Sequence, residues 1–396
     1  MASDANACEG FRFAGACGGI KKKGGLDLGL IAADAPASAA AVFTQNRVKA
    51  APVRVSQAVM RASRGRVRGV VVNSGNANAC TGARGLADAK KMGRLAAQAI
   101  DARPDEILVA STGVIGQPLP MDKLDAAIAS AGVSLYEEGF GAFAEAIMTT
   151  DRRPKTARSI VRIGRRNVTL LGCTKGAGMI APNMATTLTF IVTDAGLAPG
   201  ELDRAVRAAV LPTYNAIAVD GDTSTNDMLA VLASGVGAPI AAAERARFTD
   251  ALTELCMDLA TQLMGDGEGV HHVVTIDVRG APSDGAARAI ARRIATSPLV
   301  KTAIAGADPN WGRILCAIGN AGVAVRPDRI DVALDDVPVA ERGMAAPKLD
   351  EKRASAVMTR PAYTIAIDLH GGRGAARFLA CDLSHEYVSI NADYRS

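Results

Sequence analysis

The segment Lys175–Phe190, which reads K-G-A-G-M-I-A-P-N-M-A-T-T-L-T-F, constrains this chain more than any other. It begins with a glycine-rich turn, reaches the small residue Ala185 and two hydroxyl residues, Thr186 and Thr187, and continues as an apolar run. Such a junction suits a break of the backbone before Thr186, because an N-terminal threonine has a hydroxyl nucleophile and its own amine as a base. The chemistry that this arrangement favours is acyl transfer.

The same two threonines, Thr186 and Thr187, have a simpler interpretation as the start of a strand, where threonine is a favoured residue. Judged by composition alone, this interpretation is the stronger one. The junction therefore leaves both alternatives open until the rest of the chain is considered.

Composition limits the kind of protein that this chain forms. Its 396 residues, 49% of them hydrophobic, are enough for a large core in two or three lobes. The net charge of +5 is modest, and basic runs such as Lys21–Lys23 lack interleaved aromatic residues, so we expect no nucleic-acid partner. Seven widely spaced cysteines without a C-x-x-C pair favour a reducing compartment and no metal site. Without a signal pattern or a bilayer-length apolar run, we expect a cytoplasmic protein without a membrane partner.

Hydrophobic periodicity predicts helices and strands in no regular alternation. Helices are expected at Leu86–Ile100, Met121–Ala131, Tyr136–Met148, Glu201–Val210, Ala242–Met264 and Asp284–Ala295. Strands are expected at Val67–Asn73, Ile107–Ala110, Arg158–Gly172 (a turned pair), Thr187–Val192, His272–Val278, Ile330–Leu334, Tyr363–Leu369 and Arg377–Leu383. The mixture indicates an α/β or α+β fold with antiparallel pairing. Loops, which often carry function, are predicted at 150–158, 174–186 and 264–271.

Seven further motifs follow one another along the chain, and together they are specific. They lie at Gly10–Asp34, Val42–Val53, Val70–Gly82, Ser111–Gly116 (S-T-G-V-I-G), Val219–Asp227 (V-D-G-D-T-S-T-N-D), Asp308–Gly319 (D-P-N-W-G-R-I-L-C-A-I-G) and Asn391–Ser396 (N-A-D-Y-R-S). With these motifs and the junction segment, the chain resembles the ArgJ family over nearly its whole length. Members of this family are glutamate N-acetyltransferases, also called ornithine acetyltransferases.

The resemblance implies a layered αββα fold with two lobes, shared with self-processing aminopeptidases of the DmpA type. It also implies self-cleavage into an α chain, Met1–Ala185, and a β chain, Thr186–Ser396, which stay together, commonly as α2β2. The implied reaction moves acetyl from N2-acetyl-L-ornithine to L-glutamate through an ester on Thr186, in ping-pong order. Some members also take acetyl from acetyl-CoA, and no cofactor is implied.

The family's functional residues can be placed on this sequence one by one. Thr112 and Gly113 match the pair that forms the oxyanion hole. Substrate contacts match Thr149, Thr150, Lys175, Thr186, Glu268, Asn391 and Ser396, with one of the two adjacent threonines making the contact. Without the resemblance, these positions would be interpreted as a turn, a helix end, a strand start and a frayed C-terminal tail.

The sequence departs from the family shortly after Glu268, where most members have A-T-K and this chain has Val270, His271 and His272. This leaves open any contribution of the missing lysine to substrate preference. The two histidines do not suggest a metal pair, because adjacent residues of a strand point to opposite faces. The acidic residues of the motif Val219–Asp227 are interpreted as structural turns rather than as a cation loop.

Two other functions compete with acetyl transfer. An aminopeptidase or amidase of the related fold would use water as the acceptor instead of glutamate. A non-catalytic binding protein on the same scaffold would not need the full set of matched residues, and their presence argues against it.

Overall fold

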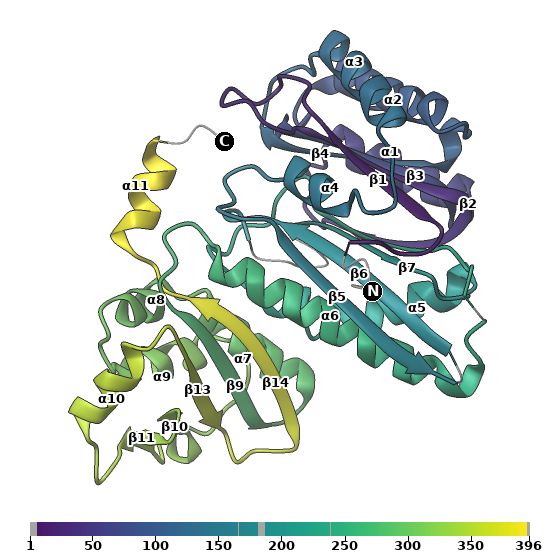
Figure 1. Cartoon of the computed structure of the whole chain (residues 1–396). Coiled ribbons are helices and arrows are strands. Elements are labelled where there is room, and N and C mark those ends of the chain that lie inside the picture. Colours follow the sequence, from purple (N-terminus) through teal and green to yellow (C-terminus); the bar gives the residue numbers. More distant parts are fainter. Residues whose placement is uncertain (1–5, 165, 181–186, 238, 394–396) are drawn as a thin grey trace.

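The computed structural model describes residues 6–164, 166–180, 187–237 and 239–393, which form two lobes, each built on one β-sheet (Figure 1). The strands of the first lobe are β1 (Phe11–Ala16), β2 (Leu28–Phe43), β3 (Arg66–Asn76), β4 (Ile107–Val114), β5 (Lys155–Ile163), β6 (Arg166–Lys175), β7 (Leu188–Thr193) and β8 (Met228–Ala233). Its helices are α1 (Ala51–Ala62), α2 (Gly82–Ala99), α3 (Met121–Val133), α4 (Phe140–Ala146), α5 (Pro199–Val210) and α6 (Arg245–Gly265). The strand order is β4-β3-β2-β8-β7-β6-β5, with β1 paired to β2.

The long strand β2 connects the two halves of this sheet, one formed with β1, β3 and β4 and the other with β8, β7, β6 and β5. Its first half pairs with β1 and β3, and its second half pairs with β8. The register shifts between Ala32 and Ala37, where the exposed Pro36 interrupts the pairing, because proline has no N–H to donate to a neighbouring strand. At this irregularity the strand passes from one half of the sheet to the other.

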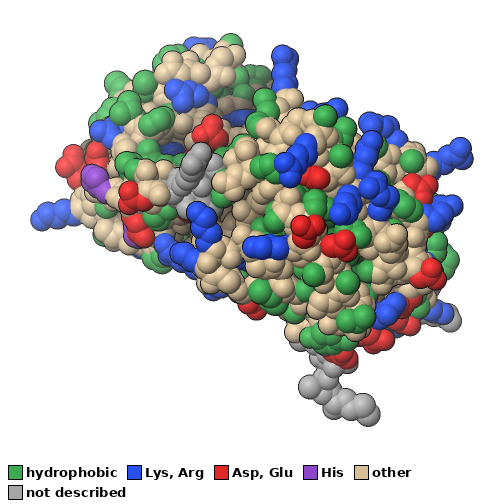
Figure 2. All heavy atoms as spheres, turned by 90° about the horizontal axis from the view of Figure 1, so that it is seen from above, with side chains coloured by type: hydrophobic (Ala, Val, Ile, Leu, Met, Phe, Trp, Pro, Cys, Tyr) green, Lys and Arg blue, Asp and Glu red, His purple; other side chains and the backbone are tan. Residues whose placement is uncertain are grey.

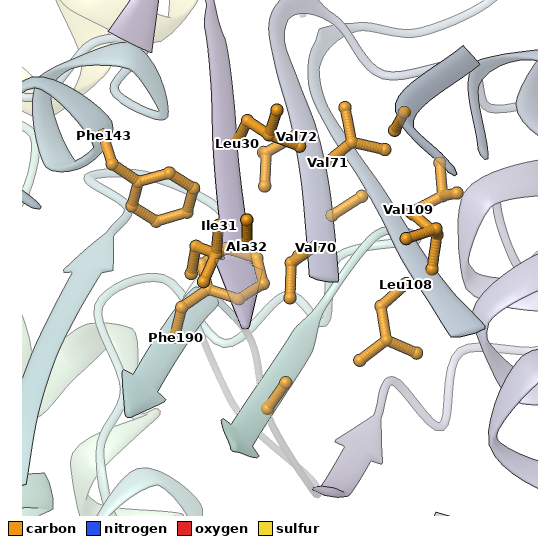
Figure 3. Packing of buried hydrophobic residues seen from close by; sticks show 14 of the residues in the cluster. Leu30, Ile31, Ala32, Val70, Val71, Val72, Leu108, Val109, Phe143 and Phe190 are labelled. Carbon is orange, nitrogen blue, oxygen red and sulfur yellow. The ribbon is translucent and has the colours of Figure 1, made fainter. Parts of the chain in front are cut away.

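Apolar side chains pack between the two halves of this sheet and between each half and its helices, and this packing produces the layers. Phe143 of α4 and Phe190 of β7 meet edge to face, with ring centroids 5.5 Å apart, beside Ile31 and Ala32 of β2 (Figure 3). Helices α1, α2 and α3 pack against β2, β3 and β4, whereas α5 and α6 pack against β2, β5 and β6. The expected layered α–β–β–α arrangement is confirmed.

The second lobe follows in the sequence. Its strands are β9 (Val273–Ala281), β10 (Asp331–Leu334), β11 (Val337–Glu341), β12 (Met344–Ala345), β13 (Ala362–Asp368) and β14 (Gly374–Cys381), in the order β12-β11-β10-β13-β9-β14. Its helices are α7 (Asp284–Ala295), α8 (Pro298–Ala305), α9 (Trp311–Gly319), α10 (Glu351–Met358) and α11 (His385–Asp393). The lobes join at β14, where the carbonyl oxygen of Leu379 accepts from the backbone N–H of Ala218 at 3.0 Å. Because the structure contains two separate sheets, the expected division into two lobes is confirmed.

Some predicted elements need correction. The helix predicted at Tyr136–Met148 is confined to Phe140–Ala146, because Tyr136 forms a β-bridge with Phe13 of β1 instead. The loop predicted at 150–158 ends earlier than expected, since Lys155 already pairs with Thr174 as the first residue of β5. Likewise, the loop predicted from residue 174 begins after Lys175, where β6 ends.

The surface is consistent with the modest net charge. On the face shown in Figure 2, Lys and Arg side chains are interspersed with Asp and Glu side chains. None of the helices in the described ranges combines the length and apolar character that a membrane crossing requires.

Candidate active site

A pocket lies where strand ends and loops of the first lobe meet α11. Its lining contains seven of the residues singled out in the sequence: Thr112, Gly113, Thr149, Thr150, Lys175, Glu268 and Asn391. Ala185, Thr186 and Ser396, which were singled out as well, lie outside the described residues. Thr187, which follows the expected cleavage site, lines the same pocket. Residues far apart in the sequence are thus collected around one cavity.

Thr112 and Gly113 lie near the end of β4, beside the end of β3. Gly113 has a φ of 128°, and a Cβ at this position would be 2.4 Å from the carbonyl carbon of Gly75. Only glycine allows the two strands to approach so closely. Asn226 holds the same region, because its side-chain amide donates to the carbonyl oxygen of Ala77 at 2.6 Å. The backbone at Gly113 is therefore well fixed, as donors to an oxyanion must be.

Lys175 ends β6 and is 8% exposed. Its Nζ donates to the Oγ1 of Thr112 at 2.8 Å and to the Oγ1 of Thr149 at 2.7 Å. Burial lowers the pKa of Lys175, while the carboxylate of Asp151 raises it. The ammonium group has three N–H donors, and these two contacts leave one for a ligand.

Glu268 supplies a carboxylate to the same pocket. One of its oxygens accepts from the Oγ1 of Thr150 at 2.9 Å, and the other accepts from the Nδ2 of Asn391 at 3.0 Å. A side chain at Gly178 would displace the Glu268 carboxylate, because its Cβ would be 2.5 Å from the Oε2 of Glu268. Helix α11 thus brings a residue from near the C-terminus to the pocket, where sequence position alone suggested a frayed tail.

The two histidines after Glu268 make contacts elsewhere. The Nε2 of His271 is 3.3 Å from Glu386, and the Nδ1 of His272 is 2.7 Å from the carbonyl oxygen of Arg360. Within the described part of the chain, no cluster of His, Cys, Asp and Glu side chains is arranged to hold a metal ion.

Sequence reasoning missed a group of hydroxyls next to the expected cleavage site. The Oγ1 of Thr189 is 2.7 Å from the Oγ1 of Thr174 and 2.8 Å from the Oγ1 of Thr187. All three side chains are buried, and they lie on the paired strands β6 and β7 or at their margin. The alternation of threonines at 187 and 189 was the signal that could have indicated this group.

Asp227 was also missed as a pocket residue, because the motif Val219–Asp227 was interpreted as a turn. That interpretation holds for Asp220, whose carboxylate accepts from the backbone N–H groups of Met179 at 2.6 Å and Ile180 at 2.9 Å. Asp227, in contrast, lines the pocket, is 3% exposed, and has an Oδ2 with no hydrogen-bond partner in the part of the chain that the structure describes. Burial raises its pKa well above the usual range.

Comparison with known proteins identifies the family of this chain. The ArgJ family matches the chain over residues 12–396. The chain belongs to the ArgJ family. The Arginine biosynthesis bifunctional protein ArgJ of Geobacter sulfurreducens is 47% identical over 98% of this chain and 99% of its own length. The protein of the same name from Symbiobacterium thermophilum is 45% identical over 100% of this chain and 99% of its own.

A solved structure of ArgJ is similar as well. The crystal structure of Arginine biosynthesis bifunctional protein ArgJ from Bacillus halodurans is 41% identical, with a TM-score of 0.50, and covers 52% of this chain and 98% of that chain. The ArgJ membership that the motifs implied is therefore confirmed, and with it the expectation that the chain is an enzyme.

Proposed function

We propose that this ArgJ-family chain is a glutamate N-acetyltransferase (ornithine acetyltransferase) of arginine biosynthesis. It would transfer acetyl from N2-acetyl-L-ornithine to L-glutamate. The observation that carries the proposal is the pocket in which Lys175, Glu268 and the Thr112–Gly113 pair lie together, next to Thr187. The names of the similar proteins, which are arginine-biosynthesis proteins, support the same pathway.

The charges of the pocket suit an amino-acid substrate. Such a substrate carries a carboxylate, for which the Lys175 ammonium is the natural partner, and an ammonium group, for which the Glu268 carboxylate is the natural partner. The Lys175 ammonium and the Glu268 carboxylate are oriented by hydrogen bonds with neighbouring side chains, namely Thr149 for Lys175 and Thr150 and Asn391 for Glu268. A substrate held at both ends would present its amide or amine in one orientation.

The reaction begins with self-cleavage. The Thr186 hydroxyl attacks the carbonyl carbon of Ala185, the C–N bond breaks, and an ester forms to the threonine oxygen. Water hydrolyses this ester, which leaves a carboxylate on Ala185 and a free amine on Thr186. That amine then serves as the base for the hydroxyl, a role that accelerates reactions about 10²- to 10⁴-fold.

In the transfer itself, the Thr186 oxygen attacks the acetyl carbonyl of N2-acetyl-L-ornithine, and L-ornithine leaves with the proton taken from the hydroxyl. The acetyl ester is next attacked by the amine of L-glutamate, which regenerates the hydroxyl. Both steps pass through an oxyanion that Thr112 and Gly113 would stabilise. No energy source is needed, because one amide is exchanged for another.

The two fragments, Met1–Ala185 and Thr186–Ser396, would remain joined after cleavage. Strand β6 of the first pairs with β7 of the second, from Leu170 opposite Thr193 to Lys175 opposite Leu188. The solved ArgJ chain covers 52% of this chain, which is close to the share that Thr186–Ser396 would form. An α2β2 assembly, a location in the cytoplasm and the use of acetyl-CoA as a second donor belong to the same proposal.

The test combines a denaturing gel with an acetyl-transfer assay. Purified protein should run as two fragments, the second beginning T-T-L-T, and should make N-acetylglutamate only when both N2-acetylornithine and glutamate are present. Thr186→Ala should stay uncleaved and inactive, whereas Thr186→Ser, which keeps the hydroxyl, should retain both activities in part. Acetyl transfer by Thr186→Ala would reject the nucleophile, and deacetylation that does not respond to glutamate would favour the amidase alternative.

A further inference from the structure

A lysine behind the pocket is enclosed by two carboxylates. The Nζ of Lys155 lies 2.5 Å from the Oδ1 of Asp151 and 2.5 Å from the Oδ2 of Asp266. The side chains of Lys155 and Asp151 are 0% exposed, and that of Asp266 is 4% exposed. Burying three charged groups is costly even when they are paired. A group of this kind is therefore a candidate for a role beyond stability.

Each carboxylate of this group also holds the backbone of a pocket loop. Asp151 accepts from the backbone N–H of Thr149 at 2.9 Å and from that of Gly176 at 2.8 Å. Asp266 accepts from the backbone N–H of Arg152 at 3.1 Å. The Lys155 ammonium thus connects three chain segments that meet at the pocket from different elements.

These three segments are the ones that carry the charged and hydroxyl groups proposed to bind substrate. Thr149 and Thr150 directly precede Asp151, Lys175 directly precedes Gly176, and Glu268 is two residues after Asp266. Lys155 itself is fully buried behind them. We propose that Lys155 is a positioning residue that fixes the substrate-binding loops of the pocket relative to one another. For the identity of the substrate, this inference depends on the proposed function.

The charges around Lys155 explain why a lysine is suited to this position. Lys175 and Lys155 both act on Asp151 and hold its pKa down to about 2, against the effect of burial, which raises it. Two ammonium groups therefore balance the two carboxylates. Without the Lys155 charge, Asp151 and Asp266 would face each other with only Lys175 as compensation, and like charges in a buried site repel strongly. The loops would then separate.

The decisive variant is Lys155→Met, which keeps an unbranched side chain but removes the charge. The KM for L-glutamate and for N2-acetyl-L-ornithine should rise at least tenfold, and the Kd of L-ornithine measured by calorimetry should rise in parallel. The turnover number should change less than threefold, because Thr112 and Gly113 lie on β4, which belongs to none of these three segments. The paired variant Lys155→Met/Asp266→Asn restores the charge balance, and it should recover part of the lost affinity.

The matched control is Lys301→Met in the second lobe. Lys301 is also a buried lysine, 4% exposed, and its Nζ donates to the carbonyl oxygen of Cys381. This control should lower the melting temperature while leaving both KM values within twofold of the wild type. An equal rise of KM in Lys301→Met and Lys155→Met would overturn the positioning role, because it would show a general effect of losing a buried lysine.

Two further results separate this inference from the proposed function. If the wild type transfers no acetyl group, the proposed function fails. If Lys155→Met and the wild type bind L-ornithine with the same Kd, the positioning role is overturned, whatever the result for the proposed function. Should Lys155→Met fail to fold, Asp266→Asn tests the same connection with a smaller change. It should raise KM about threefold, and an unchanged KM would contradict the role.

Discussion

The two lobes differ in where they place their charged side chains. The first lobe buries Asp151, Lys155, Lys175, Asp227 and Asp266 around or behind the pocket. The second lobe also buries Asp277, Lys301 and Asp382, but none of them lines the pocket. Its core is otherwise an apolar cluster, and ion pairs such as Arg353–Asp336 and Arg360–Asp335 involve largely exposed arginines. Exposed pairs contribute little to stability, whereas buried charges are costly unless they are paired. The first lobe therefore gives up stability to keep ionisable groups at the pocket.

The comparison predicts the largest effect for Lys175→Met. This substitution removes the ammonium that donates to Thr112 and Thr149 and leaves Asp151 with one cation fewer. Loss of one partner of a buried, hydrogen-bonded charge pair costs about 2–5 kcal/mol. We expect kcat/KM to fall at least 10²-fold, as measured by steady-state acetyl transfer. A variant that keeps a tenth of the wild-type kcat/KM would contradict the assignment of Lys175 as the ligand for the substrate carboxylate.

A somewhat smaller effect is expected for Thr112→Val, which replaces the hydroxyl with a methyl group of similar size. The Thr112 oxygen accepts from Lys175, so its own proton is free to be donated. Loss of one oxyanion donor lowers kcat about 10²- to 10³-fold in other enzymes. We therefore expect a decrease in kcat near the lower limit, with KM changed less than threefold. If KM rises and kcat does not change, Thr112 binds the ground state rather than the oxyanion.

Asp227→Asn should change stability in a pH-dependent way. Because burial raises the pKa of Asp227, the folded protein keeps a proton that the unfolded chain releases near pH 4. The unfolding free energy of the wild type therefore falls as pH rises from the unfolded-state pKa toward the folded-state pKa, by about 1.4 kcal/mol per pH unit. The amide cannot ionise and avoids this loss, so the variant should gain stability relative to the wild type as pH rises.

Urea denaturation at pH 5 and pH 7 measures this difference. The advantage of Asp227→Asn over the wild type should be greater at pH 7, and acetyl transfer should fall because Asp227 lines the pocket. An advantage that is equal at both pH values would mean that the carboxyl group is not held neutral by burial. A matched substitution at an exposed acid, Asp336→Asn, should show no such pH dependence.

Much of the site could be predicted from the sequence, because the matched motifs are local strings of residues. Short strings such as S-T-G-V-I-G and the residues around Lys175 can be matched without knowing which residues they contact in the folded protein. The connection from Lys155 to Asp266 could not be predicted, because these residues are far apart in the sequence and meet only when β5 packs beside α6. Lys155 even fell in a predicted loop.

The fold was predicted less completely, and composition is the reason. Strand β2 contains the stretch A-A-D-A-P-A-S-A-A-A, and alanine and proline are both depleted in strands. Its extended conformation depends on pairing with β1, β3 and β8, which a local pattern does not reveal. Helix α1 was missed as well, although Pro52 lies in its first turn, where proline is tolerated.

The smallest effect is expected for Arg353→Ala in the second lobe. Arg353 pairs with Asp336, and the two side chains are 57% and 71% exposed. An exposed ion pair typically contributes between about 0.2 and 1 kcal/mol, because water screens the charges and both side chains lose conformational freedom. We expect the unfolding free energy to change by about 0.5 kcal/mol or less in urea denaturation, with kcat/KM unchanged. Neither Arg353 nor Asp336 is among the described residues that line the pocket. A several-fold loss of kcat/KM would therefore mean that the second lobe controls the site through more than α11, and the contrast between the lobes would fail.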